Sequence, residues 1–357
     1  MTRARELAEL AAAYDSGGLS NMKNRIINGN MVIDQRNAGA SITPTNGQYT
    51  IDRWQFQVSQ ASKLTAQRST VAPAGFNNSL LVTSSSAYSV LTGDYFILNQ
   101  YIEGFNFADM GWGAVGAATV TLSFWVRSSL TGTFGGALFN GAFNRSYPFS
   151  YTISAANTWE QKSITIAGDT AGTWVGATNG VGVGVTFGLG VGATYNGTAG
   201  AWTGSGLFST TGATSVVGTN GATFYITGVQ LEKGSTATSF DVRPYGTELA
   251  LCQRYFQRIS GQSGDAFAVA TAFNATDVYG VYPLKVTMRA DPTGTASVST
   301  LFDFYANNAA QACTAISFQQ ASENQIEIST TQSGRTGGNG GWWRYRIDGW
   351  VAFSAEL

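Results

Sequence analysis

The stretch Tyr49-Thr-Ile-Asp-Arg-Trp-Gln-Phe-Gln-Val58 alternates apolar and polar side chains over most of its length. Successive side chains of a β-strand point to opposite faces of the sheet, so this alternation is typical of a strand with one buried face. Strand-length patterns recur on both sides of it, at a spacing that favours a β-sandwich or jelly roll. The other strands predicted in this half cover residues 26–27, 31–33, 80–84, 95–101, 118–127, 147–153, 160–166, 182–193 and 223–231.

A change of pattern near residue 245 indicates a domain boundary. After Arg243-Pro-Tyr-Gly246, apolar residues four positions apart predict a short helix over residues 247–259. We therefore expect an all-β protein, with a jelly-roll β-sandwich over residues 24–245 and a linker helix with a second, smaller β domain over residues 246–357. The strands predicted in this second part cover residues 266–273, 281–289, 294–298, 315–319, 325–330 and 342–353.

The beginning of the chain has helical spacing. Leu7, Leu10 and Tyr14 fall on one face of a short predicted helix, which the glycines after it end. One short amphipathic helix is not stable alone in water, so its apolar face must dock on another surface. Residues 1–23 are accordingly predicted to be an attachment or oligomerisation helix with a linker; a helix packed on its own domain is the alternative.

Glycine alternates with apolar residues in Val181-Gly-Val-Gly-Val-Thr-Phe-Gly-Leu-Gly-Val-Gly192. Repeated glycine disfavours a helix, and in a strand it leaves one face without side chains. Another group must therefore approach that face closely. We favour tight sheet packing or a subunit interface there over a ligand groove.

Charge and hydropathy exclude several classes of partner. Only 11% of the residues are charged and the net charge is -1, whereas nucleic acids and anionic membranes attract basic surfaces. We expect no nucleic-acid partner and no membrane insertion, since no apolar run reaches the roughly 18 residues of a membrane span. The start lacks the apolar core of a signal peptide, so synthesis in the cytoplasm without an export signal is expected.

Cys252 and Cys313 are predicted to be buried thiols, although a single disulfide bridge between them remains the alternative.

The chain contains no histidine, which removes Ser-His and Cys-His nucleophile pairs and every zinc site that uses histidine. Two distant cysteines supply no thiolate cluster, so neither a metal nor a cofactor is expected. Paired carboxylates could still hydrolyse a glycoside, but the sequence places no two of the candidate acids together, and we expect no enzymatic activity. The acids considered are Asp94, Glu103, Asp109, Glu160 and Asp169.

Binding of neutral sugars requires aromatic platforms together with amide and hydroxyl groups. Trp174, Tyr195 and Trp202 lie in Gly/Thr/Asn-rich sequence that resembles loops, so they are the predicted ligand-binding residues. The alternative for each of them is a place in the core.

Short motifs bracket the first half of the chain. They are residues 24–36 (NRIINGNMVIDQR) and 49–54 (YTIDRW) at its start, and 224–234 (FYITGVQLEKG), 239–245 (SFDVRPY) and 248–255 (ELALCQRY) at its end. These motifs, with the C-terminal sequence GWVAFSAEL, resemble those of bacteriophage tail fibre and tail appendage proteins. Residues 111–217, in the middle of the first half, share the general character of that family's sequences but none of these motifs.

This resemblance implies a structural virion protein, a tail fibre or similar appendage, with a jelly-roll module like those of carbohydrate-binding proteins. It also implies a homotrimer that recognises a glycan or another receptor on the host surface. Residues 1–23 are expected to bind other virion proteins, because terminal segments remain disordered unless they are tied down. A capsid decoration or head-fibre protein is the alternative. A tailspike depolymerase is a third class, which the lack of a regular repeat of 20 to 45 residues disfavours.

Overall fold

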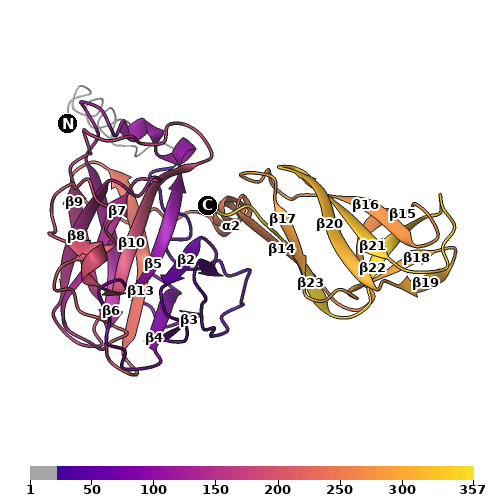
Figure 1. The fold of residues 1–357 in the computed structure, drawn as a ribbon, viewed down its shortest axis with the longest axis horizontal. Coiled ribbons are helices and arrows are strands. Elements are labelled where there is room, and N and C mark those ends of the chain that lie inside the picture. The colour runs from indigo at the N-terminus through magenta and orange to yellow at the C-terminus, as the bar shows by residue number, and fades with distance from the viewer. Residues whose placement is uncertain (1–21) are drawn as a thin grey trace, which may run out of the picture. The chain divides into compact units, whose positions relative to one another are not determined.

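The computed structural model describes residues 22–357, so the helix predicted over residues 3–14 lies outside the described part. The chain divides into two compact units, one ending at Pro244 and the other spanning Tyr245–Glu356, with Leu357 grouped with the first. Strands are the main regular secondary structure of both units (Figure 1). The predicted fold class, an all-β jelly-roll sandwich followed by a second and smaller β domain, is confirmed.

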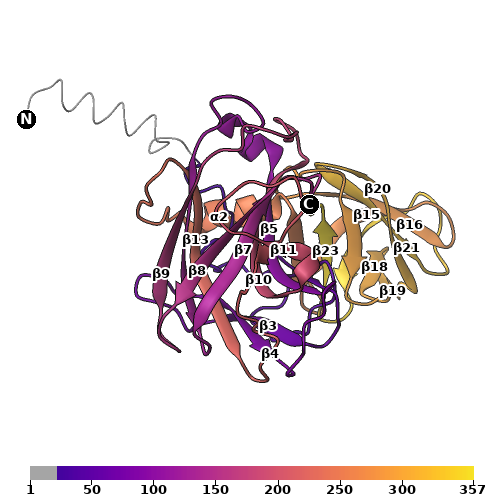
Figure 2. The same cartoon turned by 60° about the vertical axis from the view of Figure 1, so that its left-hand side comes forward.

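The first unit is a sandwich of a six-stranded and a five-stranded sheet, and the chain passes from one sheet to the other several times (Figure 2). All strand pairs within these two sheets are antiparallel. The six-stranded sheet has the order β1 (Gln48–Ile51), β2 (Trp54–Val58), β5 (Tyr95–Glu103), β10 (Val181–Val191), β7 (Gly132–Phe139), β8 (Ser146–Ile153). The five-stranded sheet has the order β3 (Leu64–Ser69), β4 (Ser79–Ser84), β13 (Thr223–Lys233), β6 (Val120–Ser128), β9 (Glu160–Ile166). The short elements are η1 (Gly104–Asn106), η2 (Ala108–Met110), η3 (Ala193–Tyr195), β11 (Asn196–Gly197) and β12 (Ser209–Thr210).

Aromatic side chains fill the space between the two sheets. The Phe187 ring of β10 lies 5.0 Å from the ring of Phe124 in β6 and 6.4 Å from that of Trp54 in β2, measured between centroids. All three side chains are fully buried. Burial of one such side chain stabilises a fold by about 1.5–3 kcal/mol. The alternation seen in the sequence therefore does mark the inner face of the sandwich.

The stretch 49–58 forms a hairpin, and the prediction of one continuous strand is wrong. Ile51 of β1 pairs with Trp54 of β2, which leaves Asp52 and Arg53 as a two-residue turn with Arg53 at φ 70°. The Asp52 carboxylate is buried and accepts hydrogen bonds from the backbone and side-chain nitrogens of Gln35, at 2.7 and 2.5 Å. Alternation has the same period on both arms of a hairpin, so it does not reveal the turn.

Residues 26–27 and 31–33 are not strands, contrary to expectation. Asn28 and Met31 adopt positive φ angles of 57° and 59°, which an extended strand does not allow. The Asn28 side chain donates to the Ile33 carbonyl and accepts from the Ile33 amide, at 2.8 and 2.9 Å. This segment keeps its apolar side chains buried while a side-chain amide replaces the hydrogen bonds of a sheet.

The second unit begins with α2 (Tyr245–Gln253) and contains two sheets. The predicted helix ends earlier than expected, because residues from Phe256 onward pair with the C-terminal strand. The three-stranded sheet has the order β14 (Phe256–Gly261), β23 (Gly349–Ser354), β17 (Thr293–Ala296). The seven-stranded sheet has the order β19 (Ala309–Ala312), β18 (Phe302–Ala306), β22 (Gly340–Tyr345), β15 (Ala266–Ala272), β16 (Asp277–Pro283), β21 (Gln325–Thr331), β20 (Ala315–Ser322).

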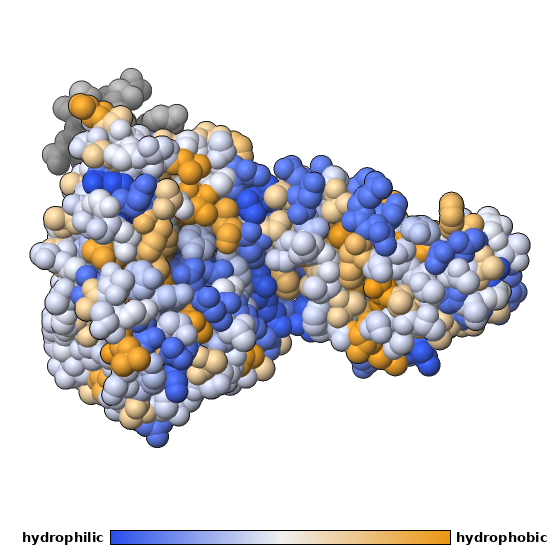
Figure 3. Space-filling view, in the orientation of Figure 1, coloured by the Kyte–Doolittle hydropathy of each residue, from blue (hydrophilic) through white to orange (hydrophobic). Residues whose placement is uncertain are grey.

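Trp343 lies in the core of the second unit, and its indole nitrogen donates to Thr330 Oγ1 at 2.9 Å. Cys252 and Cys313 are both buried thiols and are not joined to one another, as the sequence indicated. No helix within residues 22–357 is long and apolar enough to cross a membrane. The surface in Figure 3 is mostly pale to blue, with scattered orange patches, as the many neutral polar residues of the sequence imply.

Candidate functional site

Trp174 and Trp202 lie together in space, in a group that we call the indole cluster: Trp112, Trp174 and Trp202. Their ring centroids are 4.8 to 5.5 Å apart, and each pair meets edge to face. The indole nitrogens of Trp112 and Trp202 donate to the carbonyls of Ala118 and Ala167, both at 2.8 Å. The rings contact one another, and the indole nitrogens of Trp112 and Trp202 already donate hydrogen bonds within the protein. The indole cluster therefore mainly holds loops together. The part that Trp174 and Trp202 play in ligand binding stays a prediction.

A buried ion pair holds the loop that carries Trp174. Asp169 is 2% exposed and accepts two hydrogen bonds from the Arg145 guanidinium, at 2.7 and 2.6 Å. It also accepts from the Ala171 amide and the Trp174 indole nitrogen. Burial alone would raise the pKa of Asp169, but these hydrogen bonds outweigh it and lower that pKa below its usual value. The negative charge of Asp169 therefore serves to hold this loop in place.

Tyr195 belongs to a different group, on the outer face of the six-stranded sheet. Its ring lies 5.5 Å from that of Tyr95 and 5.4 Å from that of Phe208. The Phe208 ring also stacks on Phe143 at 4.5 Å. The three predicted binding residues thus divide between two places: the indole cluster contains Trp174 and Trp202, and the outer face of this sheet contains Tyr195.

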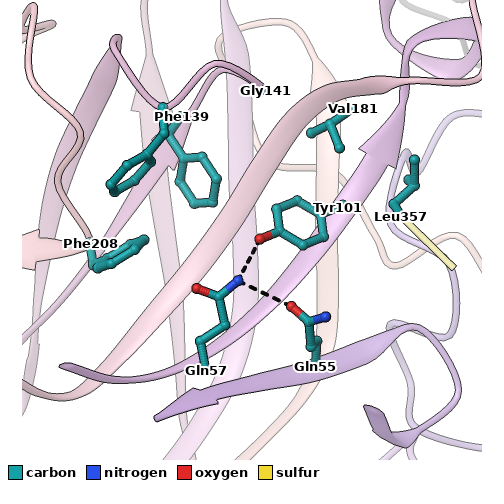
Figure 4. A pocket seen from close by; sticks show the side chains of 9 residues that line it. Gln55, Gln57, Tyr101, Phe139, Gly141, Val181, Phe208 and Leu357 are labelled. Atoms are coloured by element: carbon teal, nitrogen blue, oxygen red, sulfur yellow. Dashed lines mark hydrogen bonds between the residues drawn. The ribbon is translucent and has the colours of Figure 1, made fainter. Parts of the chain in front are cut away.

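Beside this second group the outer face is hollowed, with a volume of about 340 Å³ (Figure 4). Gln55 and Gln57 come from β2, Tyr101 from β5 and Phe139 from the end of β7. Strands β2, β5, β10 and β7 are neighbours in the sheet, so residues distant in sequence are brought to one place. The remaining residues that line the hollow are Gly141, Phe143, Val181, Phe208 and Leu357.

Hydrogen bonds orient the polar side of the hollow. Gln57 Nε2 donates to the Tyr101 hydroxyl at 2.6 Å and to Gln55 Oε1 at 3.2 Å, as the dashed lines in Figure 4 show. Burial raises the pKa of Tyr101, and hydrogen bonds from Gln57 and Asn99 only partly offset it, so the phenol is neutral near pH 7. The Tyr101 hydroxyl oxygen is the acceptor in these hydrogen bonds, so the hydroxyl keeps its own hydrogen for donation. No group within residues 22–357 donates to Gln57 Oε1.

The glycine pattern of β10 explains how the aromatic side of the hollow is built. A Cβ atom at Gly184 would lie 2.3 Å from the Phe139 ring, and one at Gly188 would lie 2.8 Å from Ser209 Oγ. The expected close approach to this face is therefore confirmed, and its cause is packing within the unit. The bare backbone of β10 provides the space in which Phe139 lies against the sheet.

The hollow thus offers aromatic faces, a hydroxyl donor and an amide acceptor, with no charged side chain among its lining residues. Such a surface suits a neutral, hydroxyl-rich ligand, because aromatic rings contact C–H groups while amides bind hydroxyls. Sequence reasoning missed Gln55, Gln57, Tyr101 and Phe139. The available signal was that the outward positions of 55–57 and 95–101 carry amide, aromatic or aliphatic side chains and no charged ones.

The acidic residues considered from the sequence are engaged in hydrogen bonds or an ion pair, or are buried. A hydrogen bond from Lys162 lowers the pKa of Glu160. Burial would raise the pKa of Asp94, but hydrogen bonds, led by that from Tyr88, lower it. A glycosidase acid requires a raised pKa, and Asp94, Glu160 and Asp169 all have the opposite shift. The other two acids are Glu103, buried at the end of β5, and Asp109, paired with Arg25 at 2.8 Å.

No protein-family model and no curated protein matches this sequence. Solved structures with weak similarity include the enzymatically active domain of bacteriophage CBA120 tailspike protein 4, at 14% identity and a TM-score of 0.34 over 59% of this chain and 22% of that chain. A putative sugar binding protein from Bacteroides thetaiotaomicron is 12% identical, with a TM-score of 0.35 over 59% of this chain and all of that one. A family 11 carbohydrate-binding module from Clostridium thermocellum is 9% identical, with a TM-score of 0.28 over 56% and 99%. Similarities this weak leave the function to be inferred from the site itself.

Proposed function

We propose that this protein binds a neutral glycan in the hollow on the six-stranded sheet and does not cleave it. The observation that carries the proposal is the pairing of the Tyr101 hydroxyl and Gln57 Oε1 with the aromatic wall of Phe139. A volume of about 340 Å³ lies at the small end of ligand pockets. The ligand in contact is accordingly one or two sugar units of a longer chain.

The biological setting that we propose is the bacteriophage particle. The motifs that bracket residues 24–256 resemble those of tail fibre and tail appendage proteins, and such an appendage requires a stable module that recognises the host surface. In this proposal the glycan belongs to the host surface, and the protein is a non-enzymatic part of the virion. The hollow then supplies recognition, while attachment to the particle depends on other parts of the chain.

The test is binding of purified full-length protein to an array of neutral and acidic surface glycans, followed by calorimetry with the best ligand. Gln57→Leu and Tyr101→Phe should each weaken binding about fivefold, because each removes one hydrogen bond worth about 1 kcal/mol. Matched changes on the other sheet, Gln161→Leu and Tyr225→Phe, should leave affinity unchanged. Because none of the side chains that line the hollow is charged, affinity should also change little between about 0.05 and 0.5 M salt.

Two results would contradict the proposal. Equal loss of binding in the variants on both sheets would show that the hollow is not the site. Release of oligosaccharides from the bound polysaccharide, measured by chromatography, would show that the protein is a depolymerase.

A further inference from the structure

The second unit exposes apolar side chains on the outer face of its seven-stranded sheet. Monomeric soluble proteins rarely leave a contiguous patch of such side chains in water. Val269 is 78% exposed and Phe273 is 73% exposed, so most of the surface of both side chains faces water. We call this set the apolar strip: Val269, Phe273, Tyr279, Val281 and Trp342.

Strand register shows that the apolar strip is continuous. Trp342 of β22 pairs directly with Val269 of β15. Tyr279 of β16 pairs with Thr271, two positions from Val269 on the same face. The Tyr279 ring also contacts Phe273, with centroids 5.6 Å apart. The strip therefore crosses three neighbouring strands without interruption.

Opposite charges flank the apolar strip on this face. Arg344 lies two residues beyond Trp342 in β22, and its nearest acidic group, Asp303, is 4.0 Å away. Glu327 of β21 pairs with Val281 in register and has no ion-pair partner within residues 22–357. The positive and negative ends lie on strands β22 and β21, separated by β15 and β16.

We infer that the apolar strip binds the same strip of a second copy of this chain, related to the first by a two-fold axis. An axis that lies in the interface and runs along the strands reverses the strand order of the partner sheet, so Glu327 of each copy then lies near Arg344 of the other. Packed sheets with nearly aligned strands are a common arrangement, and interdigitating side chains such as Val269 and Trp342 suit it. The net charge of -1 adds little repulsion between copies.

Two other occupants are weaker candidates on the same observations. A glycan would contact exposed valines at the centre of the strip, which offer no polar group to its hydroxyls. The N-terminal residues 1–21 could cover the strip within one chain. That arrangement would leave Glu327 without an opposite charge, whereas Arg344 would keep its contact with Asp303.

The experiment is sedimentation velocity of the full-length protein and its variants over a range of concentrations. The wild-type chain should have a mass that is an even multiple of the chain mass, and Val269→Asp should halve it. Val269 is largely exposed, so this variant should keep the wild-type circular dichroism spectrum. The control is Val115→Asp, which changes an even more exposed valine of the first unit and should leave the mass unchanged.

Charge exchange tests the two-fold axis directly. Glu327→Arg and Arg344→Glu should each shift the equilibrium toward the smaller species, whereas the double variant should restore the larger one. A mass that is the same for wild type and Val269→Asp would overturn the inference. A monomeric wild type whose glycan binding depends on Trp342 would also overturn it, in favour of a sugar surface, and one that associates only after removal of residues 1–21 would show that this segment covers the strip.

Discussion

At the scale of single residues, the structure depends on positions where the surrounding atoms allow only one kind of residue. Gly184 is such a residue, because the Phe139 ring occupies the space of a side chain there. Asp169 is another, since four groups donate hydrogen bonds to its buried carboxylate. The first supports a wall of the hollow, and the second holds the loop beside the indole cluster. Each allows a sharp substitution.

Gly184→Ala should destabilise the first unit by about 1–3 kcal/mol, because the new methyl group overpacks a filled site. It should also weaken glycan binding, since the Phe139 ring must move. Denaturant unfolding and calorimetry on the same sample measure both effects. Gly93→Ala is the control, because no atom lies within 4 Å of the Cβ position there. Unchanged stability in Gly184→Ala would show that Phe139 moves aside without cost.

Asp169→Asn should lower the free energy of unfolding by roughly 3 kcal/mol at pH 7, because the Arg145 guanidinium loses a buried partner. Asp109→Asn is the matched control: its carboxylate is exposed, so its pair with Arg25 should contribute less than about 1 kcal/mol.

The lowered pKa of Asp169 gives this contribution a pH dependence. The stabilisation that the Asp169 carboxylate provides is complete above the pKa of an unfolded aspartate, about 3.9. It is lost as the pH falls through the lower pKa of the folded state. Urea unfolding between pH 7 and pH 2 should therefore show the wild type and Asp169→Asn converging in acid, and a constant gap would contradict the assigned charge.

At the scale of elements, the sequence predicted strands well where one face is buried along the whole segment. Residues 160–166 match β9 fully, because their alternation and bounds are both clear. The alternation failed at Asp52 and Arg53, where a hairpin preserves the period, and it missed β7, whose glycines and alanine carry no pattern. The hollow could not be predicted, because it requires knowing that β2, β5, β10 and β7 are adjacent. Single sequences carry no record of such pairing.

At the scale of the whole molecule, each of the two units within residues 22–357 has a hydrophobic core of its own. One contains Trp54 and Phe187, and the other contains Trp343 and Phe302, with no residue shared between them. A fold with two cores does not need to unfold in one step. The residues between the cores include α2, which begins directly after Pro244.

Differential scanning calorimetry should accordingly resolve two transitions. Trp343→Ala removes a fully buried indole and should lower or abolish only the transition of the second unit, by the equivalent of about 3–5 kcal/mol. Phe187→Ala should act only on the other transition. A single cooperative transition that shifts as a whole in both variants would show that the units stabilise one another.

The glycines of β10 also determine which parts of the hollow can change without disturbing the fold. Phe139 rests directly on the backbone at Gly184, so a substitution on that strand disturbs the fold before it alters preference for a ligand. Phe143 and Phe208 come from segments between strands, where replacement changes the rim without moving the sheet. In the proposed role in host recognition, a fixed floor with an exchangeable rim would let ligand preference change while the fold is kept. Variants selected on a resistant host should then carry their substitutions in the rim.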